Sequence, residues 1–483
     1  MSPDESPSNA GNDVEERPHA PDTGHLSWED PDQKRNPANW NIGLKVLHTF
    51  IPCALAFWIT FGTSVVVPAT ELIAIQFKVG RTESVLTLSL YTLGIALGPV
   101  FIAPLSEALG RKWVYVITAS CLLAFTGGAA AAQNFGTLLV CRFLAGFLGS
   151  AGVATGAGTI GDVWALDRAG GIVSLFFILG PFLGPSLGPL AGAYILHNHE
   201  ADWRWTQYLL LILGAPICLG TLAMRETAKK QILRNAAEAV EGSQRRSLQT
   251  TLQQIMRFSV VRPIKMLCSE AIVLSLTIYT AFAYAVTFSY FGSAVYVLQL
   301  EYGLDLRQAG LSFISVVIGY LMAIVSFIVF DRTLYAKAFQ AACGDPAPEH
   351  RLYTGMLGSV LLPVGLFWNA WEAHHGGHWA TLVAAGIPFG WGAFSLFLST
   401  IIYMAQVYRA EAVASALAAN GTLRYTLGAV FPLFTIQMYQ NLGIHWAGSV
   451  WAFISLFLLP IPWLLFKYGD RLRRDSRFAQ AKN

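Results

Sequence analysis

Apolar residues along this chain gather in long stretches that short polar segments separate. A helix that crosses the hydrocarbon core of a bilayer, ~30 Å thick, needs ~20 mostly apolar residues. Twelve windows have this length and character, and we expect each to be a helix because lipid offers no partner to an unpaired backbone group. The windows are 46–68, 85–105, 113–132, 138–161, 171–196, 206–224, 271–295, 308–330, 353–371, 380–404, 413–438 and 447–466.

The windows form two groups of six, with the long polar segment 225–270 between them. Transporters built from two similar bundles have this layout, with the solute held at the interface near the bilayer midplane. We therefore predict an all-α membrane protein with 12 transmembrane helices in two six-helix bundles, 46–224 and 271–466. Residues 1–45 are expected to form a largely disordered tail and 467–483 a basic one.

Lysine and arginine are unevenly distributed among the segments that join the windows. With the N-terminus placed in the cytoplasm, 26 of the 32 basic residues fall on the cytoplasmic side. The positive-inside rule describes this distribution, so both ends are predicted to be cytoplasmic. The segment 225–270 carries nine of these residues and is expected to contact anionic cytoplasmic lipid. A linker that stays solvated and makes no such contact is the alternative.

The composition narrows the class of protein. Hydrophobic residues make up 54% of the 483 residues and charged residues 13%, about half the charged share of an ordinary soluble protein. A soluble enzyme, a nucleic-acid-binding protein and a secreted disulfide scaffold are therefore disfavoured. The six cysteines have neither disulfide nor metal spacing, and the sequence lacks an ATP-binding loop. We expect no enzyme activity, no metal and no cofactor.

The turn between the second and third windows reads A-P-L-S-E-A-L-G-R-K over 103–112. It resembles the signature of the major facilitator superfamily in this loop, G-x-L-a-D-r-x-G-r-k. Ala103 stands in place of the first glycine and Glu107 in place of the aspartate. The resemblance implies that this turn latches the outward-open state of a transport cycle. An ordinary charged loop is the alternative.

Within this turn, Gly110 permits a tight change of direction because it tolerates backbone angles that other residues avoid. A carboxylate and a guanidinium on one turn can hold neighbouring helix ends by charge and release them. The resemblance therefore suggests Glu107 and Arg111 as gating residues. Asp162 or Asp167, after the fourth window, is a plausible partner.

The fifth window contains G-P-F-L-G-P-S-L-G-P-L-A-G over 180–192. Glycine recurs every four residues, so one face of the helix is bare and lets a neighbour approach closely, while each proline removes an internal hydrogen bond. The stretch resembles the motif g-x-x-x-G-P-x-x-G-G of drug:proton antiporters, which implies export. A kinked helix with a purely structural role is the alternative. The positions concerned are Gly180, Gly184, Pro185, Gly188, Pro189 and Gly192.

Shorter matches extend the resemblance from Trp28 to about Arg477. They include N-P-A-N-W before the first window, W-R-W before the sixth, R-E-T after it and P-E-H-R-L before the ninth. Together they are similar to the fungal, twelve-span drug:proton antiporter family of the superfamily. The resemblance implies an exporter of drugs, polyamines or secondary metabolites.

Two arginines are the only charged residues within the windows. Arg424 lies about eleven residues into its window, near the midplane, and Asn420 is one helical turn away. Because an intramembrane charge marks a pathway or a partner, Arg424, Asn420 and Arg142 are candidates for the solute pathway. Arg424 paired with a helix end, or Arg142 reaching the membrane surface, are the alternatives. With no carboxylate inside a window, a neutral or anionic solute is favoured over a cation.

The seventh and tenth windows are rich in aromatic residues, which suit amphiphilic ligands as well as contacts with lipid. We expect one face, with Tyr279 and Tyr290, to line the cavity. Candidates for the coupled proton are His48, Glu71 and Glu270, although none lies at mid-window. Antiport is therefore inferred from the motif in the fifth window rather than from a visible relay.

Together these patterns predict a secondary transporter that couples proton entry to the export of a small neutral or anionic organic solute, such as an organic acid, a secondary metabolite or a drug. A uniporter or importer of the same fold, a polyamine or multidrug exporter, and a non-transporting nutrient sensor are the alternatives. We expect a monomer in the plasma membrane, with the vacuolar membrane as the alternative. Its partners would be the solute, protons and lipid, with no nucleic acid.

Overall fold

The computed structural model describes residues 28, 34–164, 168–241, 261–372 and 377–479. Over these residues the structure is helical, and its β contact is an isolated bridge between Tyr408 and Ala479. The helices before the linker are α1 (Ile42–Ser64), α2 (Thr70–Phe77), α3 (Arg81–Leu109), α4 (Arg111–Ala130), α5 (Phe135–Gly149), α6 (Ala151–Val163), α7 (Arg168–Asn198) and α8 (Arg204–Ala223). The linker contains α9 (Lys229–Glu241). We call α1 to α8 the first half.

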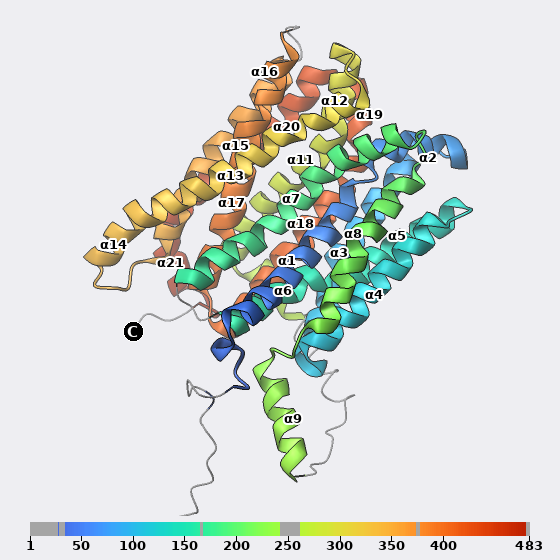
Figure 1. Cartoon of the computed structure of the whole chain (residues 1–483). Coiled ribbons are helices and arrows are strands. Elements are labelled where there is room, and N and C mark those ends of the chain that lie inside the picture. The colour runs from blue at the N-terminus through green and yellow to red at the C-terminus, as the bar shows by residue number, and fades with distance from the viewer. Residues whose placement is uncertain (1–27, 29–33, 165–167, 242–260, 373–376, 480–483) are drawn as a thin grey trace, which may run out of the picture.

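The second half begins with α11 (Ala271–Tyr302) and ends with α21. Its other helices are α12 (Leu306–Leu311), α13 (Phe313–Phe330), α14 (Ala336–Ala341), α15 (Tyr353–Glu372), α16 (Trp379–Ala384), α17 (Gly386–Val407), α18 (Ala410–Val430), α19 (Pro432–Leu442), α20 (Ile444–Leu458) and α21 (Pro460–Arg474). We call the end of the molecule at which α1 begins and α21 ends the base, and the opposite end the mouth (Figure 1).

Short polar residues and glycine set the helix ends. The side chain of Asn41 accepts a hydrogen bond from the Leu44 N–H at 2.9 Å and so caps α1. Asn134 caps α5 in the same way, at 2.8 Å from the Thr137 N–H. Such caps satisfy backbone groups that the first turn of a helix leaves unpaired. Gly110, with φ +95°, ends α3 and lets α4 begin at the next residue.

Eleven helical stretches among the described residues are long and apolar enough to cross a membrane. They coincide with eleven of the twelve predicted windows. The remaining window, 413–438, is helical as predicted and forms α18 and α19, but it is less apolar than the others. Its small and polar residues have a physical reason, because α18 packs between α11 and α3 inside the protein.

Each half is held together by long helix pairs. In the first half, α1 packs along α7 and α6, while α5 packs between α3 and α4. In the second half, α17 packs against α15 and α13, and α11 packs along α18. Figure 1 shows these helices running obliquely between the base and the mouth. Each half has its own set of packed helix pairs, and one hydrophobic core extends across both halves.

The halves touch along two seams. At one seam α3 contacts α18 and α19, and at the other α7 contacts α12 and α13. The Ser186 hydroxyl of α7 donates a hydrogen bond to the Tyr320 hydroxyl of α13 at 3.1 Å. The Gln437 side chain of α19 contacts the Thr82 hydroxyl of α3. Any space that both halves enclose must lie between these seams.

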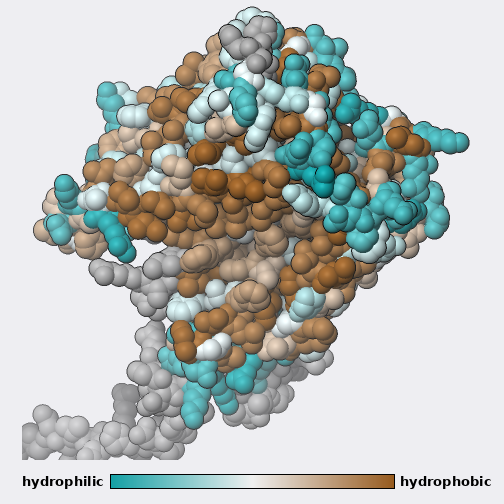
Figure 2. All heavy atoms as spheres, turned by 45° about the horizontal axis from the view of Figure 1, so that its top comes forward, coloured by the Kyte–Doolittle hydropathy of each residue, from teal (hydrophilic) through white to brown (hydrophobic). Residues whose placement is uncertain are grey.

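Large apolar side chains cover the middle of the molecular surface. Phe50, Phe176 and Phe457 are 66%, 65% and 82% exposed. Figure 2 shows a broad apolar band, with polar side chains concentrated away from it. Apolar surface of this extent is stable against lipid rather than water. The fold is therefore that of a multi-pass membrane protein.

Candidate functional site

Arg111 lies at the base, at the first position of α4. Its Nε donates a hydrogen bond to Asp162 Oδ2 at 2.6 Å, and its Nη1 donates one to the Thr155 carbonyl at 3.4 Å. Gly158 leaves room for the guanidinium, since a Cβ there would lie 2.4 Å from Arg111 Nη1. The pair therefore ties the start of α4 to the end of α6.

A carboxylate that sequence reasoning did not select, Glu226, lies against the same turn. Its Oε1 accepts a hydrogen bond from the Arg111 N–H at 2.9 Å and its Oε2 accepts one from the Lys112 N–H at 3.2 Å. A negative charge here complements the positive end of the α4 dipole. A Cβ on Gly110 would lie 2.3 Å from Glu226 Oε2, so glycine provides both the turn and the space. The R-E-T match after the sixth window was the available signal.

Glu107 lies on the last turn of α3 with its side chain exposed. It forms no hydrogen bond and no ion pair with the described residues. In this conformation the carboxylate at the start of α4 is Glu226, and the placement expected for Glu107 is not observed. Ser106 and Ala108 are buried against the rest of the protein. Glu107, between them on the last turn of α3, therefore points away from the protein. Asp167 lies outside the described residues.

The glycine stripe of α7 faces α1. A Cβ on Gly184 would lie 2.6 Å from the Phe61 nitrogen, and one on Gly188 would lie 2.8 Å from the Val65 nitrogen. The backbones therefore approach each other too closely for any side chain. Gly192 is similarly tight, with a Cβ 2.3 Å from the Val65 carbonyl oxygen, whereas Gly180 has ordinary space.

The prolines of α7 do not interrupt the helix, which is continuous from Arg168 to Asn198. Pro189 has no N–H to offer the carbonyl four residues earlier, on Pro185. The Ser64 hydroxyl of α1 donates a hydrogen bond to that carbonyl at 2.7 Å. The glycine stripe permits this contact, so the G-P pattern joins two helices rather than breaking one.

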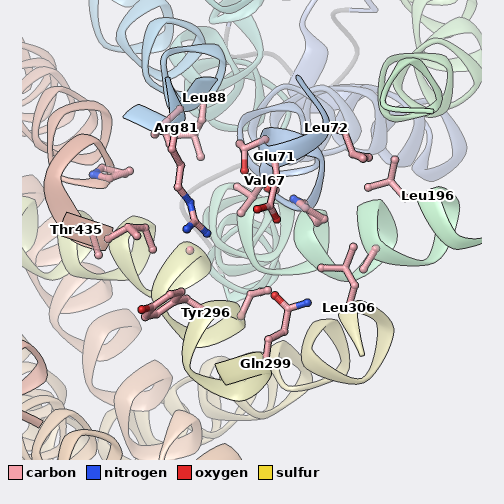
Figure 3. A pocket seen from close by; sticks show the side chains of 18 of the residues that line it. Val67, Glu71, Leu72, Arg81, Leu88, Leu196, Tyr296, Gln299, Leu306 and Thr435 are labelled. Atoms are coloured by element: carbon pink, nitrogen blue, oxygen red, sulfur yellow. Dashed lines mark hydrogen bonds between the residues drawn. The ribbon is translucent and has the colours of Figure 1, made fainter. Parts of the chain in front are cut away.

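A cavity of about 550 Å³ lies between the halves, toward the mouth (Figure 3). Its walls come from α2, α3 and α7 in the first half and from α11, α12 and α19 in the second. Most of the lining is apolar and includes Leu72, Leu88, Phe288 and Ile436. This size and character suit an amphiphilic organic molecule.

Charged side chains occur on both sides of the cavity. The first half contributes Glu71 and Arg81, and the second contributes Asp305 and Arg307. Figure 3 shows Glu71 and Arg81 pointing into the cavity opposite Gln299. Arg307 is paired with Asp305 at 3.1 Å. The Gln308 N–H, which donates a hydrogen bond to Asp305, lowers the pKa of that carboxyl and keeps it ionised.

An aromatic cluster fills the space between the halves on the base side of the cavity. Phe182 of α7 is at its centre, eleven residues before the cavity residue Ala193. Its ring centroid lies 4.7 Å from that of Phe397, 4.9 Å from Phe394 and 5.6 Å from Tyr284. One first-half side chain therefore inserts into second-half rings and separates the cavity from the base.

Arg424 lies beside this cluster, on α18. It is 5% exposed, and its guanidinium carbon lies 4.4 Å from the Phe397 ring centroid, 4.5 Å from Tyr425 and 4.7 Å from Tyr284. The cavity lining does not include it, although Phe288, which does line the cavity, contacts Tyr284 at 4.8 Å. One aromatic ring therefore stands between the guanidinium and the cavity.

Arg142 has a different environment. It is 1% exposed and lies away from the cavity, inside the first half. Its Nε donates to the Thr87 carbonyl at 3.0 Å, its Nη2 donates to the Gly62 carbonyl at 2.7 Å, and its guanidinium lies 4.1 Å from the Tyr91 ring centroid. In this conformation Arg142 ties α5 to α3 and α1 and reaches neither the cavity nor the surface.

The other expected pathway residues are buried within the second half. Asn420 donates a hydrogen bond to the Thr280 hydroxyl at 2.7 Å and so joins α18 to α11. Tyr279 contacts the Ser359 carbonyl at 3.4 Å, and Tyr290 contacts Phe389 at 5.0 Å between ring centroids. Neither tyrosine lines the cavity. This corrects our expectation, because the face of α11 that they share packs against α15 and α17.

The proton candidates differ in their surroundings. The Arg225 N–H donates to His48 Nε2 at 2.7 Å, so Nδ1 carries the hydrogen that the Leu44 carbonyl accepts at 2.8 Å. With both nitrogens engaged, His48 links the first turns of α1 to the segment that follows α8. Glu270 lies at the base, where it accepts a hydrogen bond from Ser476 at 2.7 Å. Of the three candidates, Glu71 lines the cavity.

The sequence does not single out three of the charged residues that line the cavity, or the phenylalanine at the centre of the aromatic cluster. Arg81, Asp305 and Arg307 belong to short connections between windows, where charge is ordinary. Phe182 is one of 30 phenylalanines, and its position in the G-P-F-L-G stretch was the available signal. Their relation depends on how the halves meet, which no periodicity within one half reveals.

Comparison with known proteins shows which family this chain resembles in sequence. A family model described as the Major Facilitator Superfamily matches residues 53–431. "Polyamine transporter 4" of Saccharomyces cerevisiae is 34% identical over 95% of this chain and 74% of its own length. "MFS-type transporter phm3" of Pyrenochaetopsis sp. is 36% identical over 93% and 94%. "Major facilitator superfamily multidrug transporter mdrA" of Aspergillus fumigatus is 34% identical over 97% and 77%.

A solved structure shares the arrangement of helices. The proton:xylose symporter XylE bound to 6-bromo-6-deoxy-D-glucose superimposes with a TM-score of 0.64, over 89% of this chain and 96% of that chain. The two sequences are 13% identical. The likeness therefore concerns the fold and not the solute.

Proposed function

Because this chain belongs to the major facilitator superfamily, and its named relatives are transporters, we propose that it is a proton-coupled exporter of a small neutral or anionic organic solute. The two groups of helices, 46–224 and 271–466, rock about their seams and expose the solute to one side and then the other. The linker 225–270 joins them, and α18 with α19 forms the crossing that completes the twelve. No chemical bond in the solute changes.

The cavity between the halves is the observation that carries the proposal. Because its walls come from both halves, relative movement of the halves must change its shape and access. Its apolar lining gives affinity for an organic body, and the few charged groups orient it. The glycine stripe of α7, similar to the antiporter motif, supports export rather than uptake.

The contacts of Arg111 at the base support the proposal that the turn between α3 and α4 acts as a latch in the transport cycle. Arg111, Asp162 and Glu226 tie α4, α6 and the segment after α8 to one another within the first half, while the cavity lies toward the mouth. We assign the mouth to the exterior and the base, with both tails and the linker, to the cytoplasm, in accordance with the positive-inside rule. The conformation is then outward-open. The plasma membrane is the expected location, with the vacuolar membrane as the alternative.

Glu71 is our choice for the proton carrier. It is the candidate that reaches the cavity, so solute and proton can compete there. His48 is unsuited because both ring nitrogens are already engaged in hydrogen bonds. Glu270 is unsuited because it lies at the base, among contacts with the C-terminal segment.

Export of a polyamine is the second candidate function. Glu71 and Asp305, which line the cavity, are carboxylates of the kind that a cation requires. A relative is named as a polyamine transporter. Arg81 and Arg307 stand beside these carboxylates and oppose a polycation, so we rank this function second.

Transport into inside-out vesicles tests the proposal. The probes are naphthalene-1-sulfonate, its neutral isostere naphthalene-1-sulfonamide, and spermidine. An acidic lumen should drive accumulation of the sulfonate or the sulfonamide, and an uncoupler should abolish that accumulation. Accumulation of spermidine alone would favour the second function, and uptake that ignores the pH gradient would identify a uniporter. Absence of any gradient-driven uptake, in vesicles that also move none of the metabolites retained by a gene-deletion strain, would overturn the proposal.

A further inference from the structure

The guanidinium of Arg424 is a buried cation without an acceptor. Its Nε and Nη1 are enclosed and have no hydrogen-bond partner. Among the described residues, the group forms no hydrogen bond and no ion pair, and its neighbours are the faces of three aromatic rings. Burying a charge in this way is costly, because ring faces replace only part of what water or a carboxylate supplies.

Arg142 provides an internal comparison. It is equally deep in the protein and also lies over a tyrosine ring. Two of its nitrogens nevertheless donate to backbone carbonyls at 2.7 and 3.0 Å. Its Nη1 is enclosed without a partner, so backbone carbonyls satisfy most, though not all, of the Arg142 guanidinium. Arg424 lacks both carbonyls, so packing alone does not account for it.

From these contacts we infer that Arg424 is the subsite for the anionic group of the solute. The inference rests on the proposed function and narrows it, from a neutral or anionic solute to an organic monoanion with a flat apolar body. One unpaired guanidinium matches one carboxylate or sulfonate, which can accept two parallel N–H bonds. The rings of Tyr284, Phe397 and Tyr425 would hold the flat body by stacking.

Access to the subsite requires the halves to move. Tyr284 separates Arg424 from Phe288 at the cavity wall. Phe182, from the opposite half, contacts both Tyr284 and the Phe397 ring of the Arg424 cage. Withdrawal of Phe182 would loosen two of the three rings at once. Anion binding is therefore coupled to the same rocking movement that the transport cycle uses.

A binding measurement without any ion gradient tests the inference. Purified protein in lipid nanodiscs is titrated at low chloride with naphthalene-1-sulfonate and with its neutral isostere naphthalene-1-sulfonamide, and tryptophan fluorescence reports binding. We expect the sulfonate to bind at least tenfold more tightly. Arg424→Met should remove this preference, and Arg424→Lys should retain part of it. Equal affinity of both probes for the native protein, or an unchanged preference in Arg424→Met, would overturn the inference.

Thermal stability separates a binding role from a structural one. Because Arg424 is unsatisfied without ligand, Arg424→Met should leave the melting temperature unchanged or raise it. Arg142→Met removes two hydrogen bonds and should lower it. A fall in Arg424→Met as large as that in Arg142→Met would contradict the inference. Failure of transport in vesicles with sulfonate binding intact would instead count against the proposed function.

Discussion

At the scale of single residues, two glutamates near the α3–α4 turn have opposite surroundings. Glu226 accepts hydrogen bonds from two N–H groups of α4, whereas Glu107 is exposed and has no described partner. Sequence similarity to a family loop selects Glu107, because a motif records spacing along the chain. Glu226, which follows α8, is 115 residues from Arg111 along the chain, and the contact becomes visible only when the chain is folded.

We expect Glu226→Gln to destabilise the protein by about 1 kcal/mol, since the substitution weakens a charged cap at the start of α4. Glu107→Gln is the matched control, because it removes the same charge from the adjacent turn without breaking a described contact. Thermal unfolding in detergent measures both variants. Equal loss of stability in the two would contradict the assignment of the cap to Glu226.

The ion pair between Arg111 and Asp162 predicts a kinetic effect. Arg111→Ala should slow transport at least tenfold while affinity for the probe at the cavity changes little, because the pair lies at the base and the cavity toward the mouth. The double exchange Arg111→Asp with Asp162→Arg should recover part of the rate. Steady-state uptake and equilibrium binding are measured on the same preparations. A variant that loses binding and retains the turnover rate would argue against a latch.

At the scale of elements, the contact between α1 and α7 depends on missing side chains. Gly184→Ala would place a Cβ 2.6 Å from the Phe61 nitrogen, and backbone cannot move aside as a flexible side chain can. We expect a loss of about 1–3 kcal/mol in stability, as for other overpacked interiors, and a larger loss for Gly184→Leu. Gly180→Ala belongs to the same stripe, and its Cβ would stay 3.5 Å from the nearest atom. A loss in Gly180→Ala as large as that in Gly184→Ala would contradict the close-packing account.

The elements themselves could be predicted well, and the faces they use could not. Lipid requires long apolar helices, so composition alone locates the eleven described helical stretches that are long and apolar enough to cross a membrane. The remaining window, α18 with α19, is less apolar because protein surrounds it. The sequence favours Tyr279 and Tyr290 as cavity residues, but a helix without polar asymmetry, such as α11, does not reveal which face meets the other half.

At the scale of the whole molecule, the cavity exists because the halves touch at two seams and separate between them. The charged residues that line it are Glu71 and Arg81 from the first half and Asp305 and Arg307 from the second half. The two pairs lie far apart along the sequence. Sequence periodicity describes each helix but contains no information about the relative placement of the halves. The central charge of Arg424 could be recognised from sequence, while its aromatic cage and its missing acceptor required the structure.

Locking a seam should stop the transport cycle without emptying the site. Thr82 of α3 and Gln437 of α19 touch across the halves, so Thr82→Cys with Gln437→Cys is expected to form a disulfide on oxidation, in a background where the exposed Cys268 and Cys343 are serine. Uptake should fall at least tenfold and return with a reductant, because rocking must shift α3 against α19. Maleimide labelling of residual thiols measures the extent of cross-linking, and each single cysteine variant controls for the substitutions. Complete cross-linking with undiminished uptake would mean that this seam stays fixed while the halves move elsewhere.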